Sequence, residues 1–373
     1  MKPQIALLPT LRALAGTSMR LYPEELSAAL GQHGEVVARL VEPPFGRTNH
    51  TRAWHSRWLR YVRYPRWCQS VRADLYHITD HANAQLLLAL PPQWTVVTCH
   101  DLYPLAVAHG TLRYPGRESQ AKLLPTALRL HLLRRAGALV GISQHTLEEC
   151  HRFLGTDRRR MFLAYYGIAD EFRTPPPAER LVAFRRRHGL EEGVVHVLHV
   201  GSSDPRKNLG GVLRVVAALR SRLPQPVRLV RIGSAFSPVQ ERAARALGIA
   251  DQILHLGVLS TEQVALAFRA CQVLLYPSYH EGFGRPVAEA MACGLPVVGS
   301  NRGAIPELIE DPRLRFDPDD IEGMARCIGE LVSSPQFAAE VAERGQRTAQ
   351  RFTWARHAEA VVEAYRFLLR PWR

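Results

Sequence analysis

The sequence lacks any hydrophobic run long enough to cross a bilayer. A membrane-spanning helix needs about 20 consecutive apolar residues, whereas the longest apolar run, residues 86–90, ends at Pro91 and Pro92. The apolar N-terminal stretch is interrupted by Pro9 and Arg12 and has no clean small-residue cleavage site. We therefore predict no transmembrane helix, and we interpret this stretch as a first strand and not as a signal peptide.

Paired cysteines and the common nucleotide-binding motifs are also missing. The six cysteines form no CxxC pair and no zinc-ligand spacing, so we expect reduced thiols in a cytoplasmic protein. No GxGxxG motif follows a predicted strand, and the P-loop pattern GxxxxGK does not occur. These absences argue against a dehydrogenase and against a P-loop ATPase.

Acidic residues are scarce relative to basic ones, which gives a formal net charge of +14. The basic excess is spread along the chain without a long tract or a helix-turn-helix signature, which favours an anionic substrate or membrane over nucleic acid. Lysine occurs only at Lys2, Lys122 and Lys207. A lysine retained among so many arginines suggests a site that needs a compact ammonium, although chance retention explains it equally well.

Short apolar runs alternate with longer helical patterns, which is typical of βα units and parallel sheets. Predicted strands cover residues 5–8, 95–99, 138–142, 194–200, 227–232, 273–276 and 296–299. A Pro-rich tract at 174–178 interrupts this rhythm, and a new strand–helix series follows it. We therefore predict two doubly wound α/β domains, residues 1–174 and 179–352, followed by an amphipathic terminal helix.

The most informative segment, residues 276–296, reads YPSYHEGFGRPVAEAMACGLP. Gly282 and Gly284 permit a tight loop after a buried strand, and the proline after them suits the start of a helix. A helix N-terminus behind such a loop attracts phosphate. Glu281 precedes the loop, and Glu289 is expected in the first helical turn. Their carboxylates would lie on either side of the anion and accept hydrogen bonds from hydroxyl groups. A nucleotide sugar, with phosphate between two polyols, fits this arrangement.

A purely structural interpretation is about equally strong for this segment alone, because the glycines and proline can form only a strand-to-helix turn. Arg285 favours the anion site. A cation at a helix start is unfavourable by about 0.3–1 kcal/mol unless an anion or a carboxylate lies beside it.

A second motif, residues 199–209, reads HVGSSDPRKNL. A strand is expected to end at Gly201, and a helix to begin at Asn208, a good N-cap. Ligands of doubly wound sheets bind at the carboxyl ends of strands, so Arg206 and Lys207 could neutralise a diphosphate without a metal. For this motif alone, a solvated basic turn is the stronger interpretation.

Together these segments resemble the retaining glycosyltransferases with the GT-B fold (family 4, group 1), which include bacterial mannosyltransferases, sucrose synthases and glycogen synthases. The resemblance covers nearly the whole chain and is strongest at residues 281–297, the family's two-glutamate signature. It implies two facing Rossmann-like domains with the active site in the cleft, and a C-terminal helix, 353–373, that packs back on the first domain.

The resemblance also implies the roles of the site residues. Arg206 and Lys207 would contact the diphosphate, Glu281 would lie near the transferred sugar, and Glu289 would bind the ribose hydroxyls. The implied donor-binding set further includes the backbone of Gly201, Gly282, Phe283 and Gly284.

Two features of the first half extend the resemblance. Residues 96–102, VVTCHDL, resemble a family strand that ends in a histidine near the reaction centre, so His100 would act in catalysis by bonding the donor sugar. Without the resemblance, a lone histidine at a strand end is more often structural. Residues 15–22 resemble the family's glycine loop, which places Gly16 at the donor, but the usual double glycine is missing.

Two patterns imitate metal sites. Asp317 and Asp319 spell Asp-x-Asp, but they precede a helical pattern and suit capping better. His77 and His81 have metal-ligand spacing, but at a strand end they would not share a face. We therefore expect no metal and no cofactor beyond the nucleotide-sugar co-substrate.

The predicted reaction is the retaining transfer of a hexosyl group from a nucleoside diphosphate sugar to an acceptor hydroxyl on a glycan, lipid or small molecule. GDP-mannose is the first expectation for the donor, because the context of His100 resembles bacterial mannosyltransferases; UDP-glucose and UDP-N-acetylglucosamine follow. The alternatives are a GT-B epimerase, a phosphorylase and a non-catalytic nucleotide-sugar-binding subunit. A phosphorylase would need an internal lysine for its cofactor, and Lys207 already has a role.

Residues 52–67 combine aromatic and basic side chains. At about 100° per residue, Trp54, Trp58 and Tyr61 form one stripe of a helix. The arginines on the flank and the opposite side are Arg57, Arg60 and Arg63. The stronger interpretation is that the stripe packs on the sheet of the first domain. The alternative is a helix on an anionic membrane surface, which would make the cytoplasmic protein peripheral at the inner face of the plasma membrane.

Overall fold

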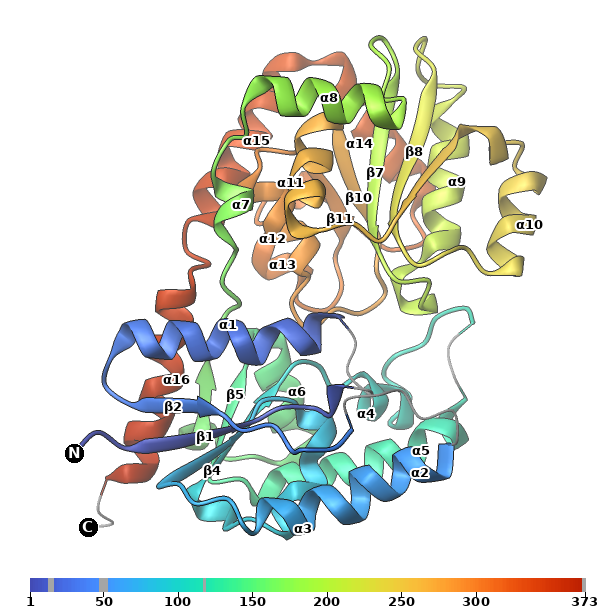
Figure 1. Cartoon of the computed structure of the whole chain (residues 1–373). Helices are drawn as coiled ribbons and strands as arrows, with labels where there is room; N and C mark the ends of the chain where they lie inside the picture. The colour runs from blue at the N-terminus through green and yellow to red at the C-terminus, as the bar shows by residue number, and fades with distance from the viewer. Residues whose placement is uncertain (13–16, 47–52, 117–118, 371–373) are drawn as a thin grey trace. The chain divides into compact units, whose positions relative to one another are not determined.

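The computed structural model describes residues 1–12, 17–46, 53–116 and 119–370 (Figure 1). The chain divides into two compact units. Unit 1 comprises Met1–Arg113, Glu118–Gly167 and Thr353–Arg373, and unit 2 comprises Tyr114–Arg117 and Ile168–Phe352. Among the described residues, no helix is both long and apolar enough to cross a membrane.

The change of unit lies a few residues before the Pro-rich tract in which the sequence analysis placed it. The Ile168 N–H donates to the Phe352 carbonyl at 3.0 Å, and the rings of Phe172 and Phe268 lie 5.8 Å apart. These contacts attach the segment before the prolines to unit 2.

Unit 1 is built on a six-stranded parallel sheet in the order β2-β1-β3-β4-β5-β6. Its strands are β1 (Gln4–Leu8), β2 (Val37–Leu40), β3 (Leu75–Ile78), β4 (Thr95–Cys99), β5 (Ala138–Gly141) and β6 (Met161–Leu163). The three strands β3, β4 and β5 are buried along their whole length, as expected for a parallel sheet covered on both faces.

The helices of unit 1 cover this sheet, and the C-terminal helix of the chain is one of them. They are α1 (Thr17–His33), α2 (Ala53–Trp58), η2 (Leu59–Arg63), α3 (Tyr64–Cys68), η3 (His81–Leu88), η4 (Pro92–Trp94), α4 (Tyr103–Ala108), α5 (Gln120–Leu130), η5 (His131–Arg135), α6 (Gln144–Leu154), η6 (Arg158–Arg160) and α16 (Trp354–Leu369). Helix α16 is fixed by buried hydrogen bonds: Tyr365 Oη lies 2.6 Å from His77 Nδ1, and His357 Nε2 lies 3.1 Å from Tyr22 Oη.

Unit 2 contains a second six-stranded parallel sheet, in the order β12-β11-β10-β7-β8-β9. Its strands are β7 (Val195–Gly201), β8 (Val227–Gly233), β9 (Ile253–Gly257), β10 (Val273–Tyr276), β11 (Val297–Ser300) and β12 (Arg315–Phe316). The two parallel sheets confirm the prediction of two doubly wound α/β domains.

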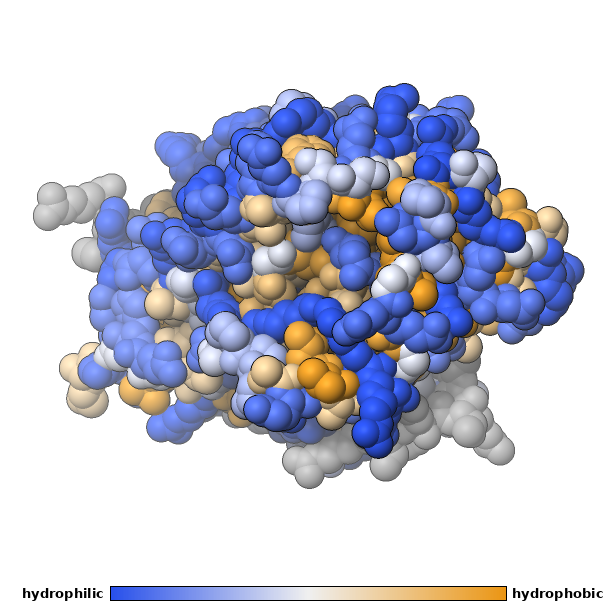
Figure 2. Space-filling view, turned by 90° about the horizontal axis from the view of Figure 1, so that it is seen from above, coloured by the Kyte–Doolittle hydropathy of each residue, from blue (hydrophilic) through white to orange (hydrophobic). Residues whose placement is uncertain are grey.

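Helices lie on both faces of the second sheet, with α9 and α10 on one side and α11 and α12 on the other (Figure 1). The helices of unit 2 are α7 (Asp170–Arg173), α8 (Ala178–His188), η7 (Pro205–Lys207), α9 (Leu209–Leu219), α10 (Pro238–Ala246), η8 (Ala250–Gln252), α11 (Thr261–Ala270), α12 (Arg285–Ala292), α13 (Ile305–Leu308), η9 (Pro312–Leu314), α14 (Ile321–Ser333) and α15 (Pro335–Ala349). The face seen in Figure 2 is mostly hydrophilic at its outline, with groups of hydrophobic residues between the hydrophilic ones.

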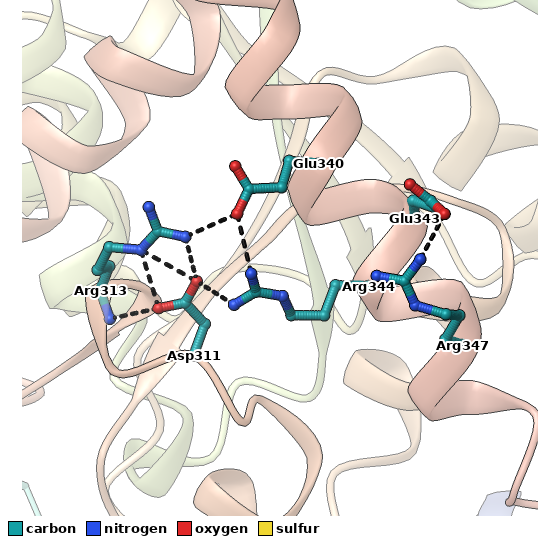
Figure 3. Close-up of polar contacts among 6 residues, drawn as sticks. All are labelled: Asp311, Arg313, Glu340, Glu343, Arg344 and Arg347. Carbon is teal, nitrogen blue, oxygen red and sulfur yellow. Dashed lines mark hydrogen bonds and ion pairs between the residues drawn. The ribbon is translucent and has the colours of Figure 1, made fainter.

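Asp311 fixes α15 to the rest of unit 2 (Figure 3). Its buried carboxylate accepts hydrogen bonds from Arg313 Nη2 at 2.6 Å and from Arg344 Nη1 at 2.8 Å. Glu340 bonds the same two guanidinium groups, at 3.0 and 2.9 Å. The hydrogen bonds from Arg313 hold the pKa of Asp311 below its usual value, against the effect of burial.

Candidate donor-binding site

The second sheet changes its direction of growth between β7 and β10. From β7 the chain adds β8 and β9 on one side, and it then places β10, β11 and β12 on the other. Open parallel sheets bind ligands at such a switch point, outside the carboxyl ends of the strands. Both sequence motifs lie there, because residues 202–207 follow β7 and residues 277–284 follow β10.

Lys207, Glu281 and Tyr276 meet at this edge of the sheet. Lys207 Nζ donates to Glu281 Oε1 at 2.7 Å and to Tyr276 Oη at 3.0 Å. The Glu281 and Tyr276 side chains are buried, and that of Lys207 is 17% exposed. An ammonium has three N–H donors. Since these bonds use two, the third remains for a ligand as far as the described residues show.

The three groups set each other's protonation. Burial lowers the pKa of Lys207, but the Glu281 carboxylate and Tyr276 outweigh it and raise that pKa overall. Burial raises the pKa of Glu281, but Lys207 outweighs it and lowers that pKa overall. Burial raises the pKa of the Tyr276 hydroxyl, which stays neutral. The pair is therefore an ammonium and a carboxylate at neutral pH.

The loop after β7 is folded by its own side chains. Asp204 Oδ1 accepts from the Arg206 N–H at 2.8 Å and starts η7. Asn208, at φ 51°, accepts from the Gly211 N–H at 3.0 Å and caps α9, as predicted. The Arg206 Nε lies 3.2 Å from Asp204 Oδ2. The loop thus presents Arg206 and Lys207 together.

Two glycines bring the β7 and β8 ends into contact. A Cβ on Gly233 would lie 1.8 Å from the Gly201 carbonyl oxygen, and one on Gly201 would lie 3.8 Å from the stem of Lys207. Sequence reasoning missed Gly233, although a glycine directly after an apolar strand was the available signal.

The loop after β10 also depends on close backbone packing. Gly284 has φ 97° and precedes α12. The Phe283 ring is buried and lies 5.4 Å from the Phe352 ring, so this residue can offer a ligand only its backbone. The Glu281 carbonyl accepts from the Ala304 N–H at 3.0 Å, and a Cβ on Gly303 would lie 2.6 Å from that carbonyl oxygen.

The expected place of Glu289 in the first turn of the helix is wrong. Helix α12 begins at Arg285, so Glu289 lies one turn further on, and the first turn contains no acidic residue. Arg285 Nε lies 3.4 Å from Glu289 Oε1. This carboxylate therefore provides the partner of Arg285, and the argument that Arg285 signals a bound anion no longer stands.

His100 lies at the end of β4 in unit 1 and is buried. Its Nε2 is 2.8 Å from the Thr79 carbonyl, and its Nδ1 is 2.5 Å from Tyr166 Oη. Since a carbonyl only accepts, Nε2 carries the proton and Nδ1 accepts from Tyr166. Burial lowers the pKa of His100 to about 4. Both ring nitrogens are thus occupied within unit 1, and a sugar contact by His100 would have to replace one of these bonds.

The first sheet has its own switch point, between β1 and β3, which sequence reasoning missed. There Thr10 Oγ1 donates to buried Asp80 Oδ2 at 2.5 Å, and Asn83 Nδ2 donates to Thr10 Oγ1 at 2.7 Å. His81 Nδ1 accepts from the His100 N–H at 3.2 Å. The polar residues directly after the strand at Leu75–Ile78 were the available signal.

The remaining candidates fall elsewhere. Gly16 lies outside the described residues. The prediction that Asp317 and Asp319 cap the following helix is wrong. Asp320 caps α14, because its Oδ1 accepts a hydrogen bond from the Gly323 N–H at 2.9 Å. Asp319 instead accepts from Tyr279 Oη at 2.6 Å, and Asp317 accepts from the Asp319 N–H at 3.1 Å.

Both halves of the chain match models of glycosyltransferase families. Residues 183–348 match the family model described as Glycosyl transferases group 1, and residues 16–172 match Glycosyltransferase Family 4. The D-inositol 3-phosphate glycosyltransferase of Streptomyces scabiei is 32% identical over 307 residues, which cover 78% of this chain and 67% of that protein. The serotype-specific mannosyltransferase WbdA of Escherichia coli is 27% identical over 286 residues, 74% of this chain. The match spans only 34% of the length of WbdA.

Solved structures show the same fold. Sucrose-phosphate synthase from Thermosynechococcus elongatus superposes with a TM-score of 0.79 at 20% identity, over 98% of this chain and 99% of that one. HepE from Anabaena, in complex with UDP and glucose, superposes with a TM-score of 0.73 at 19% identity, over 97% and 98%. The chain belongs to the GT-B glycosyltransferases of family 4 and group 1.

Proposed function

We propose that this protein is a retaining glycosyltransferase that moves a hexosyl group from a nucleoside diphosphate sugar to an acceptor hydroxyl. The observation that carries the proposal is the Lys207–Glu281 pair at the switch point of the second sheet, 2.7 Å apart. In this proposal the remaining N–H of Lys207 and the guanidinium of Arg206 bind the diphosphate. Cations placed where negative charge develops on the leaving group lower the barrier to its departure.

The other residues of the proposed site act on the donor around this pair. The Glu281 carboxylate would accept a sugar hydroxyl, Glu289 would bind the ribose, and the backbone at Gly282 and Gly284 would face the sugar and phosphate. His100 would contact the sugar only if its hydrogen bond to Thr79 or to Tyr166 were broken and replaced by one to the sugar. Retention of configuration rests on the family resemblance.

Mannose is our first choice for the transferred sugar, with GDP as its carrier. The name of WbdA, a mannosyltransferase, supports this choice, while the UDP and glucose bound to HepE keep a UDP-sugar as the next candidate. A thermal-shift screen of GDP, UDP and their sugars identifies the carrier, because a ligand at 100 times its Kd adds about 2.7 kcal/mol of stability. The matching sugar nucleotide is then the donor in a transfer assay.

The catalytic assignment is tested by Lys207→Ala and Glu281→Ala. Each change should cut transfer by at least 100-fold, about 3 kcal/mol. Because each also leaves a buried partner unpaired, folding is checked by circular dichroism, and Glu281→Gln serves as the variant of unchanged shape. The control is Arg242→Ala, an exposed arginine of α10. Near wild-type turnover in the folded variants would refute the assignment.

Metal independence is part of the proposal, since side-chain cations take the place of an ion at the diphosphate. Transfer should persist in excess EDTA. Loss of transfer that manganese or magnesium restores would contradict it. Nucleotide release without any acceptor would instead favour an epimerase.

A further inference from the structure

Five large apolar side chains of unit 1 are exposed on adjoining helices. Trp54, Trp58 and Tyr61, from α2 and η2, are 62%, 42% and 43% exposed. On α5, Leu124 and Leu128 are 49% and 61% exposed and lie one turn apart. We name these five residues the apolar surface. Exposed apolar patches with a polar rim mark protein or membrane interaction sites.

Arg129 joins the two helical segments. Its guanidinium donates to Tyr61 Oη and lies 5.7 Å from the centre of the Tyr61 ring. Figure 1 shows α2 and α5 side by side in unit 1. The apolar surface is therefore shared by two elements that are about 60 residues apart in the sequence.

The opposite side of the first segment is the one that packs inward. Leu59, Tyr64 and Cys68 are buried, and Tyr64 Oη donates to the Pro9 carbonyl at 2.6 Å. The expectation that the Trp54–Trp58–Tyr61 stripe packs on the sheet is therefore wrong. The described part of the predicted helix is helical over residues 53–68, although η2 widens it into a π-turn after Trp58. Trp54, Trp58 and Tyr61 remain exposed.

The charged residues of the two segments that form the apolar surface all have one sign. Residues 53–72 and 119–135 contain no Asp or Glu. Exposed cations of these segments are Arg57, Arg63, Arg66, Arg72, Lys122, Arg134 and Arg135. The Arg63 guanidinium lies 4.2 Å from the Phe45 ring and 5.9 Å from the Trp58 ring, which holds a cation at the edge of the apolar surface. Arg60 differs, because it donates to the Ala82 carbonyl at 2.5 Å and is half-buried.

We propose that the apolar surface and its exposed cations dock unit 1 on an anionic bilayer. Tryptophan, tyrosine and leucine enter the headgroup region while the arginines and Lys122 contact lipid phosphates, which is the binding mode of interfacial amphipathic helices. Bilayer binding stands on this surface alone. The further step, that docking brings the enzyme to a lipid-linked acceptor, rests on the proposed function.

Sedimentation with vesicles tests the docking. Full-length protein is spun with phosphatidylcholine vesicles that contain none or one third phosphatidylglycerol, at rising salt. We expect binding only to the anionic vesicles and a steep loss with salt. The triple change Arg57→Ser, Arg63→Ser, Arg66→Ser should lower the partition coefficient roughly 100-fold, because each cation near the surface contributes about 1 kcal/mol. Trp58→Ser with Leu128→Ser should lower it independently of salt.

Matched controls come from unit 2. Arg186→Ser, Arg187→Ser and Arg242→Ser remove the same charge from exposed positions, and Val182→Ser and Val239→Ser remove exposed apolar side chains. Both control sets should bind vesicles like the wild type. If the control triple lowered vesicle binding as much as the triple change in unit 1, the loss would be an effect of net charge alone. The proposed docking surface would then be refuted.

Other outcomes also overturn the proposal. Absence of binding to anionic vesicles at low salt refutes it. If the protein instead formed a dimer, and Trp58→Ser converted the dimer to a monomer, the surface would be the contact with a second copy of the chain. Donor hydrolysis, measured without vesicles, is unaffected by these variants. Failure of vesicle binding with hydrolysis intact therefore removes the docking surface and leaves the proposed function standing.

Discussion

At the scale of single residues, Tyr276 is the one that the structure adds to the proposed site. Its buried hydroxyl accepts from Lys207 Nζ at 3.0 Å, so it helps to hold the ammonium that Glu281 also binds. The tyrosine is the first residue of the informative segment 276–296, but in the sequence it is also the last residue of an apolar strand. Its position beside Lys207 depends on the pairing of β10 with β7, which no local pattern predicts.

Tyr276→Phe removes only this hydroxyl. We expect the KM for the donor to rise and kcat/KM to fall about 5-fold, near 1 kcal/mol, because one hydrogen bond to a charged group is lost. Steady-state kinetics measure both. The control is Tyr365→Phe, which removes the hydroxyl that bonds His77 in unit 1 and should lower stability without changing the donor KM. An unchanged donor KM in Tyr276→Phe would show that the tyrosine does not position Lys207.

At the scale of elements, the segment after β11 supports the segment after β10. Gly303, at φ 60°, passes so close to Glu281 that a Cβ would lie 2.6 Å from its carbonyl oxygen and 2.7 Å from its nitrogen. Both are backbone atoms and cannot rotate away. A side chain at Gly303 therefore requires the backbone of Glu281 to shift, and we expect this shift to disturb the bond of its carboxylate with Lys207.

Gly303→Ala should lower kcat/KM at least 10-fold. Gly189→Ala is the matched control, because Gly189 has a similar φ of 64° and open space where its Cβ would lie. Both substitutions carry the left-handed strain of about 1 kcal/mol, but only the first has the clash. Equal activity in the two variants, each shown to be folded, would exclude this role for Gly303.

At the scale of the whole molecule, buried histidines in both units link stability to pH. Burial lowers the pKa of His77 and of His199 to about 3, and the pKa of His100 and of His357 to about 4. In the unfolded chain a histidine titrates near 6.5. Between these values the unfolded chain binds more protons than the folded one, so stability is complete above about pH 6.5 and is lost as the pH falls toward 4.

Denaturant unfolding at pH 7.5, 6.5, 5.5 and 5.0 measures this loss. The slope should approach about 1 kcal/mol per pH unit for each histidine that is neutral when folded. In model peptides, carboxyl groups have pKa values of about 4, which is below this range. A free energy of unfolding that stays constant from pH 7.5 to 5.0 would contradict the prediction.

Local patterns along the sequence were sufficient to predict the class of the fold and three residues of the proposed site. Apolar runs that end in glycine or polar residues predicted seven of the twelve described strands within one residue, and Trp354–Leu369 forms the predicted terminal helix. The strands without a predicted range are β2, β3, β6, β9 and β12. Arg206, Lys207 and Glu281 were identifiable because a strand-end loop is a local pattern, and its chemistry can be read from neighbouring residues.

Which side chains contact one another could not be predicted from these local patterns. Arg285 forms an ion pair with Glu289, and His100 forms hydrogen bonds with Tyr166 and Thr79. The aromatic stripe at Trp58 is exposed and does not pack on the sheet. Each outcome depends on contacts or on solvent exposure set by distant parts of the chain. Periodicity specifies which residues share a face, but the packing of the whole unit decides what that face touches.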